Sequence, residues 1–482
     1  MNVLRITASM DPAMGGPPQG IRNSIAELER LGIRNEAVCC DAPDAAWLGK
    51  DSFPVHALGP GKYGFAYTPK LGPWLEENLP RFDAVIVHGL WLWPSVCATR
   101  AVARERARRK EQKTGHGLTR MKEDRSERLA ADRTGGGADC RMTSTAGGLS
   151  SEKSDVPESL NAQPSTFNSK QLRCFVMPHG MLDPWFQRDK SRRVKAVRNW
   201  FYWWLVERGV VNSADALLFT CQQELELART TFGGYRPKRE INVGYGIAEP
   251  PAFEPKMQEA FAARCPDLNG RPYLLFMSRV HPKKGVDLLV RAYARVRGEV
   301  LRGLKDQETK RLKDLELPDL VVAGPSWDSD YGREVRGLID EANRSIASTE
   351  QRTLPTANSA CVHAVDMLQG DAKWGALYGC EAFVLPSHQE NFGIAVVEAL
   401  ACGKLVLISD QVNIWREIVD DGAGLGEEDT EEGVEKLLRK FFERPVTSEE
   451  LRVTRGTPRE CYLKRFAIGP AVALLARALQ EK

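Results

Sequence analysis

The stretch Phe383-Val-Leu-Pro-Ser-His-Gln-Glu-Asn-Phe-Gly-Ile-Ala-Val-Val-Glu-Ala-Leu-Ala-Cys-Gly403 is the most informative part of this chain. It begins with a short apolar run that Pro386 closes, as at the end of a buried strand. A polar loop follows, and residues 394–402 have the composition of a helix that stops at a glycine. Glu390 is therefore expected just before a helix N-terminus, with Glu398 about 12 Å further along the helix. The free N–H groups of a helix N-terminus can bind an anion.

Length and composition indicate a soluble protein of several domains. A chain of 482 residues is too long for one ordinary core. The net charge of +3 does not call for a nucleic-acid partner. No apolar run approaches the ~20 residues of a membrane span, and the N-terminus is interpreted as a first strand rather than a signal peptide. Eleven cysteines are then expected as reduced thiols, and a cytoplasmic location follows.

Apolar runs alternate with helical segments in two parts of the chain, which predicts an α/β fold with a doubly wound parallel sheet in each part. The runs expected as strands are residues 3–7, 84–87, 174–177 and 216–220, then 273–277, 320–323, 362–364, 383–385 and 405–408. The loop after the first run, residues 11–20, lacks G-x-G-x-x-G, so a dinucleotide site is not indicated. We place the first Rossmann-like domain at residues 1–242, the second at 243–457, and a final helix at 458–482.

Residues from about 104 to 170 interrupt this alternation. They begin with clustered arginines and continue into Gly, Ser and Thr with few large apolar groups. Such a segment buries too little surface to offset its ordering entropy, so a disordered insertion is expected there. A shorter polar insertion is expected at residues 344–360.

With its flanking residues, the stretch 383–403 resembles the E-x7-E signature of retaining GT-B glycosyltransferases, the large bacterial family also called glycosyltransferase family 4, group 1. Spacing alone is weak evidence, but Leu-Pro-Ser before, Asn-Phe-Gly between and Glu-Ala-Leu-Ala-Cys-Gly after match too. The resemblance implies two Rossmann-like domains facing across a cleft, with a final helix that crosses back to the first domain. It also implies that Glu390 orients the donor sugar and that Glu398 binds ribose hydroxyls. Asn391, Phe392 and Gly393 would contact the donor as well.

A second segment supports this resemblance. Met277-Ser-Arg-Val-His-Pro-Lys-Lys-Gly-Val-Asp287 is similar to the family's Gly-Arg-x-x-x-x-Lys-Gly element, with a serine in place of the first glycine. Arg279 and Lys284 match the basic pair that binds the diphosphate, and cations suit a leaving group that gains negative charge. A solvated basic loop is the alternative, and Lys283 is expected at the surface.

Three further positions match the family in the first domain. Gly15 and Gly16 match the glycine turn that lets the backbone approach the phosphates, although an ordinary Gly-Pro loop is an equal alternative. In Met177-Pro-His-Gly-Met-Leu-Asp-Pro-Trp185, His179 matches the histidine that lies against the donor sugar at the reaction centre. His88, in Val87-His-Gly-Leu-Trp91, is a second candidate on the acceptor side. One departure is Gly244-Tyr-Gly-Ile247 in place of Pro-Asn-Gly at the domain junction, which is expected to alter hinge or donor contacts.

An aromatic run and an Asp-x-Asp motif are interpreted as structural rather than catalytic. The densest aromatic run, Arg198-Asn-Trp-Phe-Tyr-Trp-Trp-Leu205, follows a basic segment and has the look of an interfacial helix. A helix facing the core is the preferred interpretation. Asp328 and Asp330 form Asp-x-Asp, which holds a metal in GT-A transferases. A polar surface loop is preferred here, so no metal site is expected.

The resemblance to this family implies a retaining, metal-independent hexosyltransferase. It would move a hexose from a UDP- or GDP-sugar to a glycan or lipid-linked acceptor, in the synthesis of cell-surface polysaccharide. No cofactor is expected beyond the sugar nucleotide as co-substrate, and contact with the inner face of the membrane is left open. The alternative is an epimerase-like or non-catalytic sugar-nucleotide-binding protein of the same fold.

Overall fold

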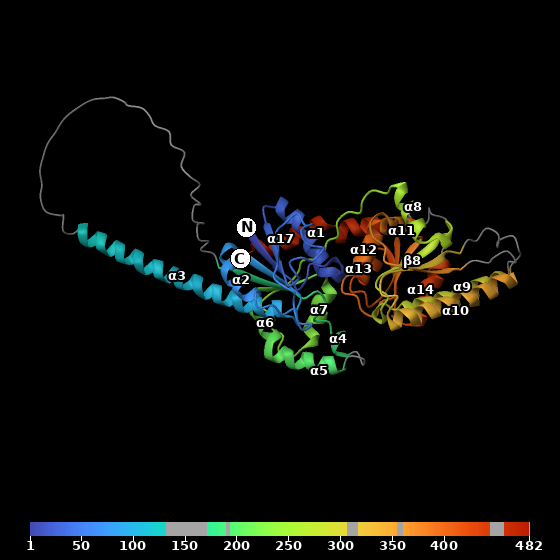
Figure 1. Cartoon of the computed structure of the whole chain (residues 1–482), viewed down its shortest axis with the longest axis horizontal. Helices are drawn as coiled ribbons and strands as arrows, with labels where there is room; N and C mark the ends of the chain where they lie inside the picture. The colour runs from blue at the N-terminus through green and yellow to red at the C-terminus, as the bar shows by residue number, and fades with distance from the viewer. Residues whose placement is uncertain (132–170, 189–192, 306–316, 354–359, 444–456, 482) are drawn as a thin grey trace, which may run out of the picture.

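Buried apolar runs form the strands of two parallel sheets, each in its own α/β unit (Figure 1). The computed structural model describes residues 1–131, 171–188, 193–305, 317–353, 360–443 and 457–481. The expected insertions therefore lie partly outside the described residues, at 132–170 and 354–359. The two units with their helices give a GT-B architecture, as the sequence predicted.

The first sheet has seven parallel strands in the order β3-β2-β1-β4-β5-β6-β7. Its strands are β1 (Asn2–Ile6), β2 (Arg34–Cys39), β3 (Val55–Ala57), β4 (Ala84–His88), β5 (Arg173–Met177), β6 (Ala216–Phe219) and β7 (Glu240–Asn242). Successive residues of one strand enter different apolar clusters: Val85 and Val87 pack on one face, whereas Ala84 and Ile86 pack on the other. The sheet is therefore covered on both faces, as parallel sheets are.

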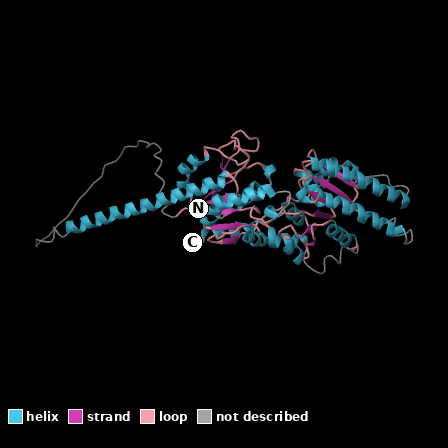
Figure 2. Ribbon diagram, turned by 90° about the horizontal axis from the view of Figure 1, so that it is seen from below, coloured by secondary structure: helices cyan, strands magenta, loops and turns pink. Residues whose placement is uncertain are grey.

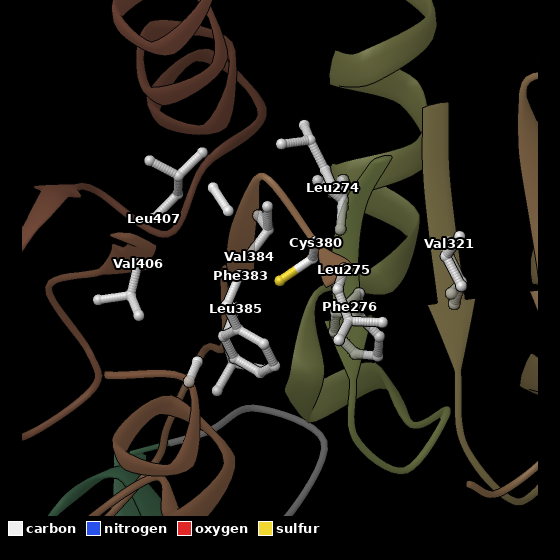
Figure 3. Close-up of a cluster of buried hydrophobic side chains, with 14 of the residues drawn as sticks. Leu274, Leu275, Phe276, Val321, Cys380, Phe383, Val384, Leu385, Val406 and Leu407 are labelled. Atoms are coloured by element: carbon white, nitrogen blue, oxygen red, sulfur yellow. The ribbon is translucent and has the colours of Figure 1, made fainter. Parts of the chain in front are cut away.

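The second sheet has six parallel strands in the order β10-β9-β8-β11-β12-β13. Its strands are β8 (Tyr273–Met277), β9 (Asp319–Ala323), β10 (Val362–Val365), β11 (Ala382–Leu385), β12 (Leu405–Ser409) and β13 (Gly424–Glu427). Figure 3 shows the core that its central strands build, where Leu275 and Phe276 of β8 lie beside Phe383 of β11. Ala382 and Phe383 pair in register with Leu274 and Leu275.

Helices flank the strands of both sheets (Figure 2). In the first unit they are α1 (Gly16–Arg30), α2 (Leu71–Asn78), α3 (Trp93–Ala131), α4 (Trp185–Arg188), α5 (Arg193–Tyr202), α6 (Arg208–Ser213) and α7 (Gln222–Thr231). In the second unit they are α8 (Pro255–Arg264), α9 (Val286–Lys305), α10 (Asp330–Thr353), α11 (Gly370–Gly379), α12 (Ile394–Ala401), α13 (Trp415–Asp420) and α14 (Glu431–Phe442). The chain then continues through α16 (Pro458–Cys461) and a π-helical turn, η7 (Tyr462–Phe466), into α17 (Ile468–Gln480).

The last helix, α17, packs on the first sheet rather than on the second. Val472, Leu475 and Leu479 of α17 join the cluster that covers Val3 of β1 and Ile86 of β4. Its amphipathic face supplies the apolar cover that this side of the sheet needs.

The strand order fixes where ligands approach. In each sheet the order reverses next to the first strand of the unit, between β1 and β4 and between β8 and β11. Loops after neighbouring strands diverge at such a point and leave a crevice at the carboxyl ends of the strands. Gly15, Arg279 and Glu390 each follow one of these four strands, and His88 is the last residue of β4.

The predicted start of the disordered insertion, at about residue 104, was wrong. Residues 104–131 continue α3, which extends away from the sheet in Figure 1. Arg109 is buried, pairs with Glu105 at 2.7 Å, and donates to the carbonyls of Leu79 and Phe82 at 3.1 Å. Arg109 therefore serves as an internal partner of the first unit, whereas Arg104 is exposed and pairs with Glu76 at the surface. The shorter insertion is also misplaced, because α10 extends to Thr353.

The aromatic run does not form the expected core-facing helix. No residue of α5 is buried. Within the following π-helical turn, η4 (Trp203–Glu207), Trp203 is fully buried, stacks on Phe232 and donates from Nε1 to the Gly233 carbonyl at 2.8 Å. Tyr202 packs partly buried against the same apolar cluster. Trp200, Phe201, Trp204 and Leu205 of the run are exposed.

Candidate active site

The loop between β11 and α12 carries Glu390 and is held by backbone hydrogen bonds. The Glu390 N–H donates to the Gln411 carbonyl at 3.0 Å, and the Asn413 N–H donates to the Glu390 carbonyl at 3.0 Å. Gly393 takes φ +79° as the N-cap of α12. That left-handed conformation favours glycine, which explains the glycine in this motif.

Lys284 and Glu390 form an ion pair between the ends of β8 and β11. Lys284 is 9% exposed and Glu390 22% exposed at their side chains. Burial by itself would raise the pKa of the Glu390 carboxyl, but the Lys284 ammonium holds that pKa below its ordinary value, with Lys283 and Arg279 contributing. Glu390 is therefore a carboxylate under ordinary conditions, oriented by a buried cation.

The close packing of the two loops brings this pair together. Gly285 follows Lys284 with φ +64°, and a Cβ there would lie 2.2 Å from the Pro386 carbonyl oxygen. Only glycine lets the β8 loop approach the end of β11 so closely. Gly285 therefore allows the close approach that lets Lys284 reach Glu390.

Arg279 and Lys283 occupy different environments around this pair. Arg279 is exposed, so its guanidinium is accessible to a ligand in the crevice. Lys283 is only partly exposed, and its ammonium lies 5.5 Å and 5.0 Å from the ring centres of Trp185 and Phe186 in the first unit. Burial and the neighbouring Lys284 lower the pKa of Lys283 to about 8. The expectation that Lys283 is a plain surface residue was wrong, because aromatic rings from the other unit cover it.

The first turn of α12 is open to an anion. Its N-cap, Gly393, has no side chain that could accept from the N–H groups of that turn. Further along α12, Glu398 forms an ion pair with Lys373 of α11 at 2.6 Å. Lys373 was not identified from the sequence, since nothing in its surroundings resembles a motif.

His179 and His88 lie together at the ends of β5 and β4. The Nδ1 atom of His88 and the Nε2 atom of His179 are 2.9 Å apart, within hydrogen-bond distance. Burial, with the charge of Arg5 nearby, lowers the pKa of His179 to about 3, and burial with His179 and Arg5 holds the pKa of His88 well below its ordinary value. Both rings are therefore neutral, and they line a cavity of about 30 Å³ that also borders Arg5 and Tyr245.

His179 is held in an unusual backbone conformation, with φ +53°. The next residue, Gly180, donates its N–H to the buried Glu224 carboxylate at 2.6 Å. Glu224 also accepts from the N–H of Thr220 at 2.8 Å. Glu224 was not identified from the sequence. It is an acidic residue in the first turn of a helix, which is too common a position to indicate a functional role.

The glycine loop after β1 is connected to both units through Tyr245. Gly15 takes φ +80°, and nothing lies within 4 Å of a Cβ built on Gly15 or Gly16, so the turn is open to a ligand. The Tyr245 hydroxyl donates to the Gly16 carbonyl. The Tyr245 ring lies 4.9 Å from that of Phe392 and 6.4 Å from that of His179. Tyr245, which stands where the family has Pro-Asn-Gly, therefore contacts the glycine loop, the Glu390 loop and the His179 loop.

Further hydrogen bonds link the Glu390 loop to the first unit. Gln389 Nε2 donates to the Asp183 carboxylate at 2.9 Å, and Asn391 Nδ2 donates to the Thr220 hydroxyl at 2.9 Å. Asn391 also lies against Gly180, where a Cβ would come within 2.8 Å of its side chain. The Glu390 loop therefore packs against the loops of the first unit that follow β5 and β6.

Asp328 and Asp330 lie elsewhere, at the start of α10. Both are exposed, and Asp330 pairs with Arg333 three residues further along the chain. Among the described residues, no group of three or more His, Cys, Asp or Glu side chains could hold a metal ion. In the same part of the chain, no helix is both long and apolar enough to cross a bilayer.

Comparisons with known proteins agree with this geometry. Residues 266–455 of this chain match the family described as Glycosyl transferases group 1. Over 250 residues it is 26% identical to D-inositol 3-phosphate glycosyltransferase of Streptosporangium roseum, covering 51% of each chain. Over 99 residues it is 39% identical to N,N'-diacetylbacillosaminyl-diphospho-undecaprenol alpha-1,3-N-acetylgalactosaminyltransferase of Campylobacter jejuni, covering 19% of this chain and 26% of the relative. The chain spans about half the length of the D-inositol 3-phosphate glycosyltransferases that it matches.

Solved structures show the fold. Sucrose-phosphate synthase from Thermosynechococcus elongatus superposes with a TM-score of 0.57 at 16% identity, over 100% of this chain and 98% of that one. Anabaena HepE, solved in complex with UDP and glucose, superposes with a TM-score of 0.59 at 13% identity over 100% of both chains. At these identities the likeness establishes the GT-B fold alone.

Proposed function

We propose that the protein is a retaining glycosyltransferase that moves a hexose from a nucleotide-diphosphate sugar to a glycan or lipid-linked acceptor in cell-surface polysaccharide synthesis. The observation that carries this proposal is the buried Lys284–Glu390 ion pair, placed between the exposed Arg279 and the uncapped start of α12. A diphosphate requires cations and free N–H groups, and a sugar requires an oriented carboxylate. This crevice offers both at the carboxyl ends of neighbouring strands.

Electrostatic stabilisation of the leaving group would supply most of the rate. As the bond from the sugar carbon to the diphosphate oxygen breaks, its electron pair remains on the diphosphate. The acceptor oxygen bonds to that carbon, and its proton passes to an oxygen of the departing diphosphate. Arg279, Lys284 and the first turn of α12 are positioned to stabilise the charge that develops on the diphosphate. They require no reorganisation, because the loops that hold them are already packed.

The remaining residues would position the two substrates. Glu390 accepts hydrogen bonds from the donor sugar, and Glu398 accepts from the ribose hydroxyls once Lys373 shifts or shares its contact. Neutral His179 uses Nε2 toward His88, which leaves its other ring nitrogen for a sugar hydroxyl. The open glycine turn at Gly15 and Gly16 lets the backbone of the first unit approach the phosphates.

A thermal-shift screen of UDP-, GDP- and ADP-sugars tests the binding part of this proposal. A donor at about 100 times its dissociation constant should stabilise the fold by about 2.7 kcal/mol. Lys284→Ala should abolish the shift, whereas Lys440→Ala, which removes an exposed ion-paired lysine, should keep it. An equal loss in both variants would contradict the site.

Product analysis tests the chemistry. Transfer should need an acceptor and should keep the anomeric configuration of the donor sugar. Release of free sugar or an epimer without an acceptor would favour the epimerase-like alternative. Activity should persist in EDTA, since cationic side chains neutralise the diphosphate. A strict Mn²⁺ requirement that Asp328→Ala or Asp330→Ala abolishes would overturn metal independence.

A further inference from the structure

The helix α5 and the turn η4 present a broad apolar face to solvent. The exposed fractions are 87% for Val194, 59% for Val197, 51% for Trp200, 57% for Phe201 and 81% for Leu205. Val194, Val197, Phe201 and Leu205 are spaced three or four residues apart, and so align along one side of the helical segment. We call these five residues the aromatic face. Exposed patches of this kind mark interaction sites.

The opposite side of the same segment is firmly attached to the first unit. Trp203 is fully buried against Phe232. The buried Glu207 accepts from the Trp91 N–H at 2.8 Å and from the Ser95 hydroxyl at 2.9 Å. The aromatic face is therefore a fixed surface of the domain, shown with α5 along the lower edge of the first unit in Figure 1.

Charge indicates what this face contacts. Arg193, Lys195 and Arg198 on α5 are all exposed, and residues 193–206 contain no acidic residue. A helix that carries cations beside exposed tryptophan, phenylalanine and leucine suits the headgroup region of an anionic bilayer. A second copy of the chain fits less well, because a two-fold contact through this face would bring the same three cations together.

The buried side of the segment that carries the aromatic face contacts the predicted acceptor side. The Trp91 ring lies 6.2 Å from that of Tyr202 and 6.4 Å from that of Trp203. Trp91 belongs to the loop after β4 that begins at His88, and its Nε1 donates to the Met181 carbonyl at 3.1 Å, two residues beyond His179. A surface that holds this side of the crevice at a bilayer would present it to an acceptor anchored there.

We propose that the aromatic face, with Arg193, Lys195 and Arg198, docks the protein on an anionic lipid bilayer. The advantage to acceptor transfer rests on the proposed function. Docking itself does not, because vesicle binding requires neither donor nor acceptor. The two can therefore fail separately.

Flotation with phosphatidylcholine vesicles, with and without phosphatidylglycerol, tests the proposal. The full chain should float with the anionic vesicles, and added salt should weaken the association. The triple variant Trp200→Ser, Phe201→Ser, Leu205→Ser should lose flotation. A control variant, Leu31→Ser, Leu463→Ser, Leu474→Ser, removes side chains that are 51%, 49% and 48% exposed elsewhere and should float like the unaltered protein.

A charge variant separates the two contributions. Arg193→Gln, Lys195→Gln, Arg198→Gln should bind anionic vesicles about 10- to 100-fold more weakly and lose the preference for them. Far-ultraviolet circular dichroism and cooperative melting check that each variant is folded. The proposal is overturned if the unaltered protein does not float, or if the folded aromatic variant floats as well. A dimer in sedimentation velocity that only the aromatic variant abolishes, without flotation, would assign the face to self-association instead.

Discussion

Replacing Lys284 with methionine tests the centre of the proposed site. Methionine keeps an unbranched side chain of similar length but removes the ammonium that pairs with Glu390. At an effective dielectric constant of about 20, opposite charges about 4 Å apart attract by about 4 kcal/mol. Desolvation of both groups offsets part of this, so Lys284→Met should cost the ligand-free fold about 1–3 kcal/mol. That corresponds to a fall in Tm of about 3–10 °C for domains of this size.

The pH dependence of this effect has a definite sign. The folded-state pKa of Glu390 lies below the ordinary value of 4.5, so its contribution to stability is present above that value and is lost as pH falls through the folded-state pKa. The Tm difference between the unaltered protein and Lys284→Met should therefore be largest near neutral pH and should shrink below about pH 4.5.

The catalytic effect should be larger than the effect on stability. Losing one preorganised positive group costs about 2–4 kcal/mol of transition-state stabilisation, or about 30- to 1000-fold in kcat/KM. Lys283→Met is the matched control, because it removes the same charge from the adjacent residue, which lies over aromatic rings instead of pairing with Glu390. Steady-state kinetics with the donor found in the thermal-shift screen measure both. A value of kcat/KM for Lys284→Met within about threefold of the unaltered enzyme, or no lower than that of Lys283→Met, would refute this reasoning.

Three other substitutions follow from contacts in the structure. Tyr245→Phe removes the hydroxyl that holds the Gly16 carbonyl, and kinetics should show a rise in KM for the donor of about 5- to 10-fold, whereas an unchanged KM would show that the glycine turn needs no such support. Glu398→Gln should also chiefly raise the donor KM, while a fall confined to kcat would contradict a ribose-binding role. Arg109→Met should lower the unfolding free energy by about 3 kcal/mol in thermal or denaturant melts, because it removes the buried guanidinium that pairs with Glu105 and donates to the carbonyls of Leu79 and Phe82. Arg108→Met, at the more exposed of the two arginines that pair with Glu105, should change it by less than about 1 kcal/mol.

Local sequence determined the fold class and the identity of several site elements. Strands buried on both faces appear as continuous apolar runs, which made most of the central strands of both sheets recognisable. The inner strand β2 and the edge strands β3, β7 and β13 carry no such run and were not predicted. The Glu390 loop was placed correctly before a helix because its proline, glycine and apolar signals all lie within one short segment.

Only the tertiary structure decided which side chains meet and which faces are exposed. Lys284 and Glu390 are 106 residues apart and pair because β8 and β11 are neighbours at the point where the strand order reverses. The same holds for Glu398 with Lys373, and for Tyr245 with Gly16. The sequence of a segment shows how its polar and apolar residues are spaced, but not which other segments pack against it. An amphipathic aromatic helix therefore has the same sequence whether it faces the core or solvent, and a charged run such as that around Arg109 is solvated or buried according to the carbonyls that the fold brings to it.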